Sequence, residues 1–276
     1  MKKITAGKND AGQRLDKFLL KFLESMPKSL LYKAFRKKRI KVNGKKADGT
    51  YILQENDVLE LYINDEFFGE KKTEEFNEKP EIDVVYEDEN ILIADKPKGM
   101  LMHGTTKDRK TLILNLLSYL YIKGEYNPEN EQSFSPAFAN RIDKNTRGLV
   151  IAAKNAAALR ELNEKIRNGE VKKFYLCTLS KEPAQKSGEI ETYLKKNEAE
   201  NKVYVCSKDE ADAKYAKTRY NILEKTSDGV LCEVELLTGR THQIRAHMAH
   251  IGCPILSDVK YGAKKDGKKG YQELCS

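Results

Sequence analysis

The spacing of the apolar residues changes once along this chain and divides it into two parts. From residue 15 to residue 35 the apolar side chains recur every three or four positions, as on one face of a helix. After Pro80 they form short runs of the kind found in strands, such as residues 91–94. The change predicts a small module followed by a larger, strand-rich domain, and 276 residues suffice for both.

Residues 12–64 are predicted to form a small α/β module, with two helices on a short antiparallel sheet. Ile40 and Val42 alternate with polar residues and lead into Asn-Gly at 43–44, the pattern of a strand that enters a tight hairpin turn. Residues 58–63 are rich in apolar residues and supply a closing strand. The module therefore has its own elements and enough apolar residues for a small core.

This module is strongly basic. Residues 28–46 contain nine lysines and arginines and no acidic residue. A lysine run is usually a solvated face, but these cations straddle a helix end and a hairpin, so folding would gather them into one patch. Such a patch neutralises phosphates and gains affinity by releasing counterions. The residues of this patch that are predicted to contact a polyanion are Arg36, Lys37, Lys38, Arg39, Lys41 and Lys45.

Residues 65–80 carry mixed charges without periodicity and are predicted to be an interdomain linker with a few apolar anchor points. The domain at 81–276 is predicted to be α+β, with helices flanking a mixed, largely antiparallel sheet. Its predicted strands are 82–86, 91–94, 149–153, 174–179, 215–223 and 230–237, and its predicted helices are 155–167 and 241–250.

The composition excludes several classes of protein. Five scattered cysteines without a Cys-x-x-Cys pair argue against a disulfide framework and against a thiolate zinc site. The chain shows neither a signal peptide nor an apolar run of membrane-spanning length, so we expect a cytoplasmic protein, with a monomer as the default state. The net charge of +8 favours the capture of polyanions.

The first motif with residues that could take part in a reaction surrounds Asp143. It lies in a polar loop that runs through Gly148 into an apolar strand. Arg141, Lys144 and Arg147 flank this carboxylate, and nearby cations favour its ionised form. An ionised carboxylate beside a cationic patch is a reasonable nucleophile against an electrophilic sugar or base. By itself, however, the pattern fits a surface ion pair better.

The second motif spans residues 236–250, where a strand reaches Gly239 and feeds polar and cationic residues into a helix start. His242, His247 and His250 raise the question of zinc, but their offsets of five and three do not place them on one helix face. No metal site is therefore expected. His242 either contacts a phosphate or caps the turn.

The third motif is a strand in which Lys173 and Tyr175 share one face and Phe174 and Leu176 share the other. Taken together, residues 140–151, the Lys-Phe-Tyr-Leu at 173–176 and the Gly-Arg-Thr-His-Gln-Ile-Arg at 239–245 closely resemble the RluA-type pseudouridine synthases. That resemblance runs from about residue 80 to the end of the chain.

The amino-terminal module resembles an S-four-like RNA-binding domain, a type named after a ribosomal small-subunit protein. The resemblance rests on RLDKFL at 14–19, IKVNGK at 40–45 and NDV at 56–58. Members of the synthase family that carry such a domain act on structured RNA. The resemblance therefore implies large-subunit ribosomal RNA as the favoured target, with transfer RNA as the alternative.

The resemblance also implies roles for individual residues. Asp143 would attack a flipped-out uridine, Arg245 would pair with Asp143, and Tyr175 would stack on the base. Arg141 would fill the space that the base leaves. No cofactor is implied, because a carboxylate and a proton acceptor suffice. The residues predicted to bind the substrate are Arg141, Lys173, Arg240 and His242.

Two departures from the family pattern stand out. Many relatives begin the aspartate motif with His, where this chain has Asn140. Relatives also continue into a further strand where this chain stops at residues 271–276, which predicts an exposed sheet edge or a truncation.

Two other functions compete with the synthase. One is a non-catalytic, ribosome-associated RNA-binding protein, which would have no need of the set Asp143, Tyr175 and Arg245. The other is a metal-dependent nuclease, which would need several acidic ligands, and neither motif offers a second carboxylate.

Overall fold

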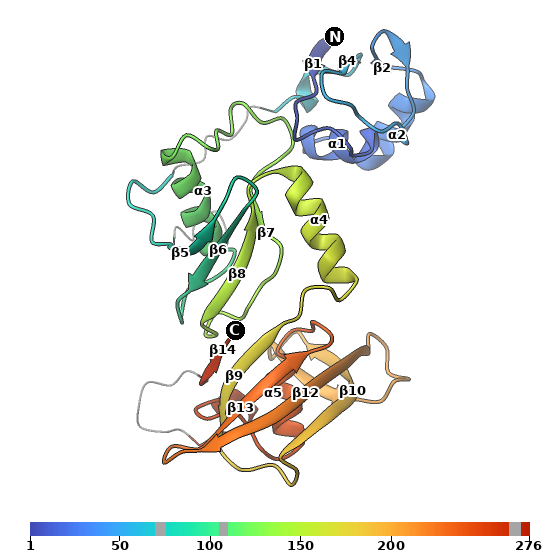
Figure 1. Ribbon diagram of the computed structural model, residues 1–276. Coiled ribbons are helices and arrows are strands. Elements are labelled where there is room, and N and C mark those ends of the chain that lie inside the picture. The colour runs from blue at the N-terminus through green and yellow to red at the C-terminus, as the bar shows by residue number, and fades with distance from the viewer. Residues whose placement is uncertain (70–75, 105–109, 265–271) are drawn as a thin grey trace.

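Two helices and a four-stranded sheet make up the amino-terminal module at the top of Figure 1. The antiparallel sheet has the order β1–β4–β2–β3, with β1 at Lys2–Thr5, β2 at Ile40–Val42, β3 at Lys45–Lys46 and β4 at Val58–Leu61. Helices α1 (Leu15–Phe22) and α2 (Lys28–Arg36) share a core with these strands. The computed structural model describes residues 1–69, 76–104, 110–264 and 272–276.

The sequence pattern explains most of this module. Asn43 and Gly44 both have positive φ angles, 51° and 74°, which confirms the predicted Asn-Gly hairpin turn. Strand β1 precedes the predicted start of the module at residue 12 and pairs with β4. The sequence gives no sign of β1, because Ile4 is its only buried side chain and a single apolar residue shows no period.

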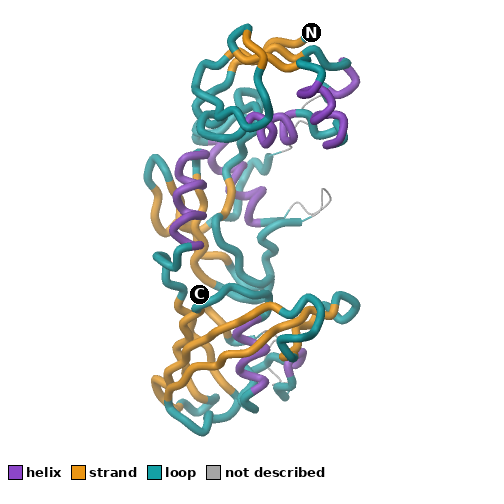
Figure 2. The backbone as a smooth tube through the Cα atoms, turned by 90° about the vertical axis from the view of Figure 1, so that its right-hand side faces the viewer, coloured by secondary structure: helices purple, strands orange, loops and turns teal. Residues whose placement is uncertain are grey.

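A second antiparallel sheet, with the order β5–β6–β8–β7, forms the middle of the molecule (Figures 1 and 2). Its strands are β5 (Asp83–Glu87), β6 (Ile91–Lys96), β7 (Ala137–Phe138) and β8 (Gly148–Ala153), and its helices are α3 (Leu112–Ile122) and α4 (Ala156–Arg167). Helix α3 was not expected, because its apolar residues lie all around the helix and conceal its period.

The third sheet has the order β11–β10–β12–β13–β9–β14 and lies at the bottom of Figure 1. Its strands are β9 (Phe174–Leu179), β10 (Ser187–Asn197), β11 (Lys202–Cys206), β12 (Lys214–Lys225), β13 (Val230–Leu236) and β14 (Leu274–Cys275), and α5 (Gln243–His250) packs on one face. Strands β10 and β11 were not expected. In β10 only Ile190 and Leu194 are buried, and that spacing of four suits a helix as well as a strand.

Strand β14 joins the second and third sheets. It pairs antiparallel with β9 through Leu274 and Cys177, and its other side meets the start of β8. There Ser276 N–H donates to the Arg147 carbonyl at 2.9 Å, and the Leu149 N–H donates to the Ser276 carbonyl at 3.2 Å. The expected exposed edge is therefore wrong for β9, which β14 covers, while residue 271 lies outside the described residues.

Gly148 makes this close approach feasible. Its φ is +131°, a backbone conformation that side chains disfavour, and a Cβ at this position would lie 2.3 Å from the Ser276 carbonyl oxygen. Any other residue would push β14 away from β8.

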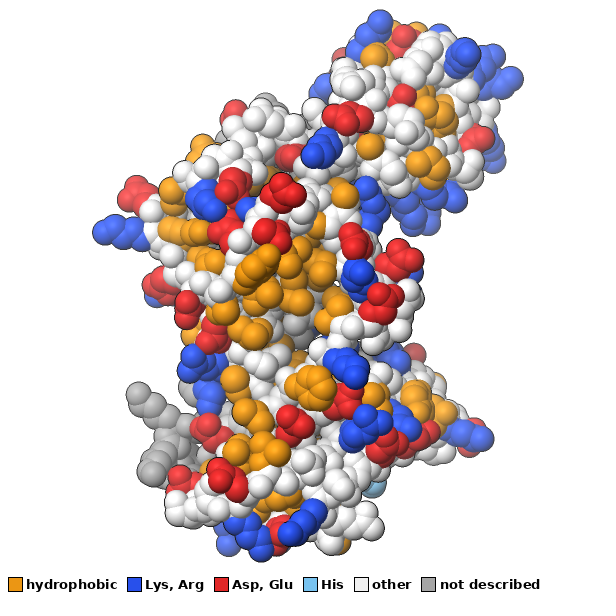
Figure 3. All heavy atoms as spheres, viewed as in Figure 1, with side chains coloured by type: hydrophobic (Ala, Val, Ile, Leu, Met, Phe, Trp, Pro, Cys, Tyr) orange, Lys and Arg blue, Asp and Glu red, His pale blue; other side chains and the backbone are white. Residues whose placement is uncertain are grey.

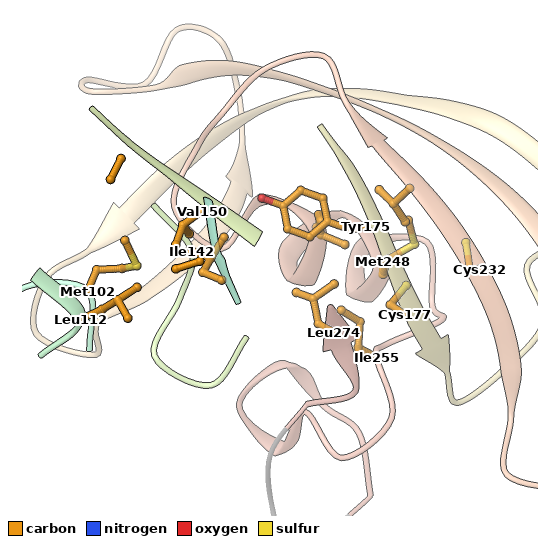
Figure 4. Packing of buried hydrophobic residues seen from close by; sticks show 14 of the residues in the cluster. Met102, Leu112, Ile142, Val150, Tyr175, Cys177, Cys232, Met248, Ile255 and Leu274 are labelled. Carbon is orange, nitrogen blue, oxygen red and sulfur yellow. The ribbon is translucent and has the colours of Figure 1, made fainter. Parts of the chain in front are cut away.

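One hydrophobic core extends across this junction. It contains Leu92 and Val150 from the second sheet, Cys177 and Val234 from the third, and Leu274 from β14. Figure 4 shows Tyr175 between Ile142 and Val150 on one side and Met248 and Cys177 on the other. The two sheets thus form one packed unit, the mixed, largely antiparallel α+β domain that the sequence predicts.

The amino-terminal module is attached to the middle of the molecule by hydrogen bonds. Asn9 Nδ2 donates to Glu131 Oε1 at 2.7 Å, and Ser133 Oγ donates to the buried Asp10 Oδ1 at 2.7 Å. The predicted linker begins with a short 3₁₀ helix at Asp65–Phe67, and its residues 70–75 lie outside the described residues. None of the helices in the described segments has the length and apolar character needed to cross a bilayer.

The predicted apolar anchor points of the linker are present on both sides. Phe67 and Phe68 pack against the core of the module. Phe76 stacks on Tyr121 of α3, with the ring centroids 4.4 Å apart. The linker residues that the structure describes are therefore packed against their neighbours at both ends.

Candidate active site

Asp143 lies in the loop between β7 and β8, half-buried and facing α5. Its Oδ2 is 3.5 Å from Arg245 Nη1 and 3.7 Å from His242 Nε2. The fold thus brings the first and second sequence motifs together. Of the cations that flank Asp143 in sequence, Arg147 turns away and pairs with Asp95, with Nη2 and Oδ2 2.7 Å apart. The cationic surroundings of Asp143 therefore come in large part from α5.

Arg245 has a second and closer partner that the sequence analysis missed. Its Nε and Nη2 donate to the two oxygens of Asp258 at 2.6 and 2.8 Å, and both residues are buried. Burial alone would lower the pKa of Arg245, but the hydrogen bonds and charge of Asp258 outweigh it and raise that pKa. Asp258 therefore fixes the guanidinium, and Arg245 reaches Asp143 with its remaining nitrogen.

His242 does not cap the turn. It occupies the N-cap position of α5 with a positive φ of 51°, and its side chain makes no capping hydrogen bond. Instead, its Nδ1 lies 3.0 Å from the Tyr261 hydroxyl and its Nε2 points at Asp143. Burial lowers the pKa of His242, although the charge of Asp143 opposes this. A neutral imidazole thus lies beside the carboxylate.

Gln243 holds the turn that leads into α5. Its Oε1 accepts from Arg240 N–H at 3.0 Å and from Thr238 Oγ1 at 2.8 Å, while its Nε2 donates to the Lys217 carbonyl at 3.0 Å. The buried amide thereby ties the second motif to β12. Arg240, which is exposed, donates from Nε to the Tyr215 carbonyl at 2.9 Å.

The third motif lies beside the second. Lys173 Nζ is 3.4 Å from the position that a Cβ on Gly239 would take, so the lysine covers the glycine turn. Tyr175 is buried, whereas Phe174 and Leu176 are 48% and 45% exposed, which confirms the predicted alternation. Burial raises the pKa of Tyr175, against a weaker opposing hydrogen bond with Ser276.

Lys96 is a further residue of the site that the sequence analysis passed over. It is fully buried, and its ammonium group donates to the carbonyls of Pro97, Met100 and Lys144, each at 2.9 Å. Burial lowers its pKa to about 8, although Asp143 opposes the shift. Because Lys144 follows Asp143, the ammonium clamps the loop that carries the carboxylate.

Arg141 and Asn140 lie on the same loop as Asp143. Arg141 is exposed, and its charge adds to burial in lowering the pKa of His103. The Asn140 side-chain oxygen accepts from the Ile151 N–H at 2.8 Å. The departure from the family pattern at position 140 is thus accommodated by a hydrogen bond to β8.

The histidines do not form a metal site. His247 is fully buried between the hydroxyls of Thr192 and Thr218, at 2.9 Å from each. In the segments that the structure describes, no group of three or more His, Cys, Asp or Glu side chains is arranged to hold a metal ion. The second carboxylate that a nuclease would need is present as Asp258, but Arg245 occupies both of its oxygens.

The basic residues of the module are displayed to solvent. Arg36, Lys37, Lys38, Arg39 and Lys45 are exposed, and Lys41 is half-buried beside Glu60, 3.9 Å away. Figure 3 shows blue side chains gathered around this end of the molecule.

A hollow of about 1030 Å³ lies away from Asp143, at the junction of the second and third sheets. Leu176 lines it, and Leu176 faces away from the side of β9 that carries Tyr175. Its rim charges pair with each other, Arg147 with Asp95 and Lys98 with Glu273. We therefore locate the candidate chemistry at the α5 face.

The comparisons with known proteins identify the family of this chain. A family described as RNA pseudouridylate synthase matches residues 90–250. A Mycoplasma capricolum subsp. capricolum protein named "Uncharacterized RNA pseudouridine synthase" is 34% identical over 281 aligned positions, covering 96% of this chain and 87% of that protein. The chain belongs to the RluA-type RNA pseudouridine synthases.

Other relatives of this synthase point the same way. Ribosomal large subunit pseudouridine synthase C of Vibrio parahaemolyticus is 32% identical and covers 92% of this chain and 78% of its own length. The structure of human RNA pseudouridylate synthase domain containing 1 superposes with a TM-score of 0.57 at 22% identity, covering 71% of this chain and 76% of that one, and so shares the fold. As a member of this family, the chain is an isomerase that forms pseudouridine in RNA.

Proposed function

We propose that this synthase isomerises specific uridines in structured RNA, with large-subunit ribosomal RNA as its substrate and Asp143 as its nucleophile. The observation that carries the proposal is the half-buried Asp143 carboxylate held between Arg245 and His242. A relative that covers nearly the whole chain is named a large-subunit synthase, which supports the choice of RNA. A surface ion pair, the alternative for Asp143, would not require the start of α5 to supply both Arg245 and His242 to this carboxylate.

The reaction begins with extrusion of the nucleotide, because the glycosidic bond is inaccessible within a stacked helix. Asp143 attacks the extruded uridine, the bond between base and ribose breaks, and the base turns and rejoins the ribose through its carbon 5. Arg245 keeps the carboxylate ionised and oriented, and Asp258 in turn keeps Arg245 in place. The reaction is an isomerisation and needs no cofactor.

Other residues of the site bind the nucleotide. Tyr175, which is buried beside the site, stacks on the base and helps to remove the carbon 5 proton. Arg141 is exposed on the loop before Asp143, where it fills the space that the base vacates. Lys173, Arg240 and His242 surround the start of α5 and contact the substrate backbone.

The amino-terminal module makes the first contacts with the RNA. We assign it to the S-four-like type, acting through its exposed cations, and place residues 12–64, 65–80 and 81–276 as module, linker and catalytic domain. The enzyme acts as a cytoplasmic monomer on ribosomal RNA, with transfer RNA as the alternative substrate. Its basic surface favours phosphate contacts that fix position without reading sequence.

The test compares the protein with its Asp143→Asn variant on unmodified ribosomal and transfer RNA transcripts. Pseudouridine is mapped by a chemical adduct that stops reverse transcription. We expect new stops on the large-subunit transcript with the wild type and none with the variant, while both bind RNA equally. Stops with both proteins would reject Asp143 as the nucleophile. Binding by both proteins without stops from either would favour the non-catalytic RNA-binding alternative.

A further inference from the structure

A second pocket, of about 230 Å³, opens on the amino-terminal module. It lies between α2 and the segment that follows β4, far from the Asp143 loop in the chain. Its walls include the buried side chains of Met26, Ala34 and Ile63 and the exposed ring of Tyr62. The pocket therefore combines an apolar interior with an aromatic edge.

The rim of this pocket is cationic. Lys33, Lys37 and Arg39 line it, and all three are exposed. Within the described segments none of them has a carboxylate within ion-pair distance. One carboxylate, Glu66, also lines the pocket, and its Oε1 accepts from the Asn64 amide at 3.3 Å. The rim thus offers three cations that are free to bind an anion at little desolvation cost.

Tyr62 is held in place as a platform. Its backbone N–H donates to the Arg39 carbonyl at 2.9 Å, and its hydroxyl donates to Glu60 Oε2 at 3.2 Å. Lys41 Nζ lies 5.1 Å from the ring centroid, so a cation already covers part of the ring. Even so, the side chain remains 39% exposed. A fixed, exposed aromatic ring beside unpaired cations has the chemistry of a base-stacking site.

We propose that this pocket binds one unpaired nucleotide of the RNA, with the base against Tyr62 and the phosphate on Lys33, Lys37 and Arg39. The proposal rests on the RNA-binding role of the module and adds a nucleotide site to it. An unpaired base can leave its stack and enter the pocket, whereas a base within a duplex cannot. A purely apolar ligand would leave the three cations without a counter-charge.

The decisive experiment measures the dissociation constants of two fluorescent RNAs at 0.15 M salt: a hairpin with an unpaired loop and a fully paired duplex of equal length. We expect Tyr62→Ala to weaken hairpin binding about fivefold or more, the lower end of what loss of a stacking side chain costs. Duplex binding should change less than about twofold, because phosphate contacts alone hold it. Tyr62→Phe, which keeps the ring, should behave as the wild type.

Two controls complete the design. Tyr86→Ala removes an exposed tyrosine from β5, outside the module, and should alter neither constant. Thermal unfolding of each variant identifies any loss that comes from misfolding. Equal losses for hairpin and duplex with Tyr62→Ala, or no loss for either, would overturn the nucleotide site. A wild type that binds the hairpin no better than the duplex would overturn it as well.

The outcome is separable from that of the proposed function. If the wild type forms pseudouridine and Tyr62→Ala binds the hairpin normally, the nucleotide site fails and the catalytic assignment stands. If Tyr62→Ala binds the hairpin weakly and no pseudouridine forms, the nucleotide site stands and the catalytic assignment fails.

Discussion

The candidate active site and the amino-terminal module both contain positive charge, but they hold it in opposite ways. In the candidate active site, Arg245 is buried and fixed by the two hydrogen bonds that it donates to Asp258. In the module, Arg36 and Lys45 are exposed, and no partner within ion-pair distance is seen in the described segments. The charge of Arg245 is held in a fixed position before a substrate binds, whereas the charges of Arg36 and Lys45 are solvated.

The difference fits the roles that we propose for the two regions. A reacting carboxylate gains from charges that need no reorganisation during the reaction, and those charges must be buried to act strongly. Capture of a long polyanion gains from many weak contacts that form and break independently, and exposed cations serve this purpose. The same residue type therefore has a large structural role in one region and almost none in the other.

The largest effect should come from breaking the buried ion pair. We expect Asp258→Asn to lower the free energy of unfolding by about 3 to 5 kcal/mol, because it strands the buried charge of Arg245. The matched control is Asp95→Asn, which breaks the largely exposed pair with Arg147 and should cost at most about 1 kcal/mol. Urea unfolding measures both. Equal losses of free energy of unfolding in the two variants would contradict the expected difference between the buried and the exposed ion pair.

Lys96→Met should have the next largest effect. The substitution keeps an unbranched side chain and removes the ammonium group, so three carbonyls lose a donor. We expect a loss of about 1 to 3 kcal/mol in the free energy of unfolding and a fall in kcat of about tenfold, with KM little changed, as the Asp143 loop loosens. The half-buried neighbour Lys98 provides the control variant, Lys98→Met. A Lys96→Met variant with normal kcat would contradict the role of Lys96 in holding the Asp143 loop.

His247 should make stability depend on pH. Burial lowers its pKa to about 4, so between about pH 6.5 and pH 4 the unfolded chain binds a proton that the folded chain does not. Stability is therefore lost as the pH falls through this window, by at most about 3 kcal/mol. His247→Gln, which keeps a hydrogen-bonding side chain between the two threonines, should lose less over the same range. If the free energy of unfolding falls equally with pH in the two proteins, His247 is not the group that makes stability depend on pH.

The smallest effect on stability should come from the module. We expect Arg36→Gln combined with Lys45→Gln to change the free energy of unfolding by less than about 0.5 kcal/mol. The same variant should reduce the slope of log affinity against log salt concentration by about 1.5, since each cation releases roughly one counterion. Filter binding over a range of salt concentrations checks this. An unchanged slope would remove these two residues from the RNA interface.

The sequence predicted the strands that carry the motifs because their side chains alternate clearly, as in β9 with Tyr175 buried and Phe174 exposed. It also identified Asp143 and Arg245, which the fold brings together. The pairing of Asp258 with Arg245 could not be predicted from the sequence, because neither motif includes Asp258 and only the fold brings the two residues together. Lys96 was within reach: it shares the parity of Leu92 and Ala94 in β6, which places it on the buried face.

The arrangement of β14 has a consequence for when the enzyme becomes competent during synthesis. Leu149, at the start of β8, bonds to Ser276, although the two residues lie 127 positions apart. The start of the strand that follows the Asp143 loop therefore lacks this support until Ser276 has been translated. A nascent chain can bury its amino-terminal module early, but such distant contacts form late and slowly. The amino-terminal module can thus fold before the Asp143 loop gains the support of β14.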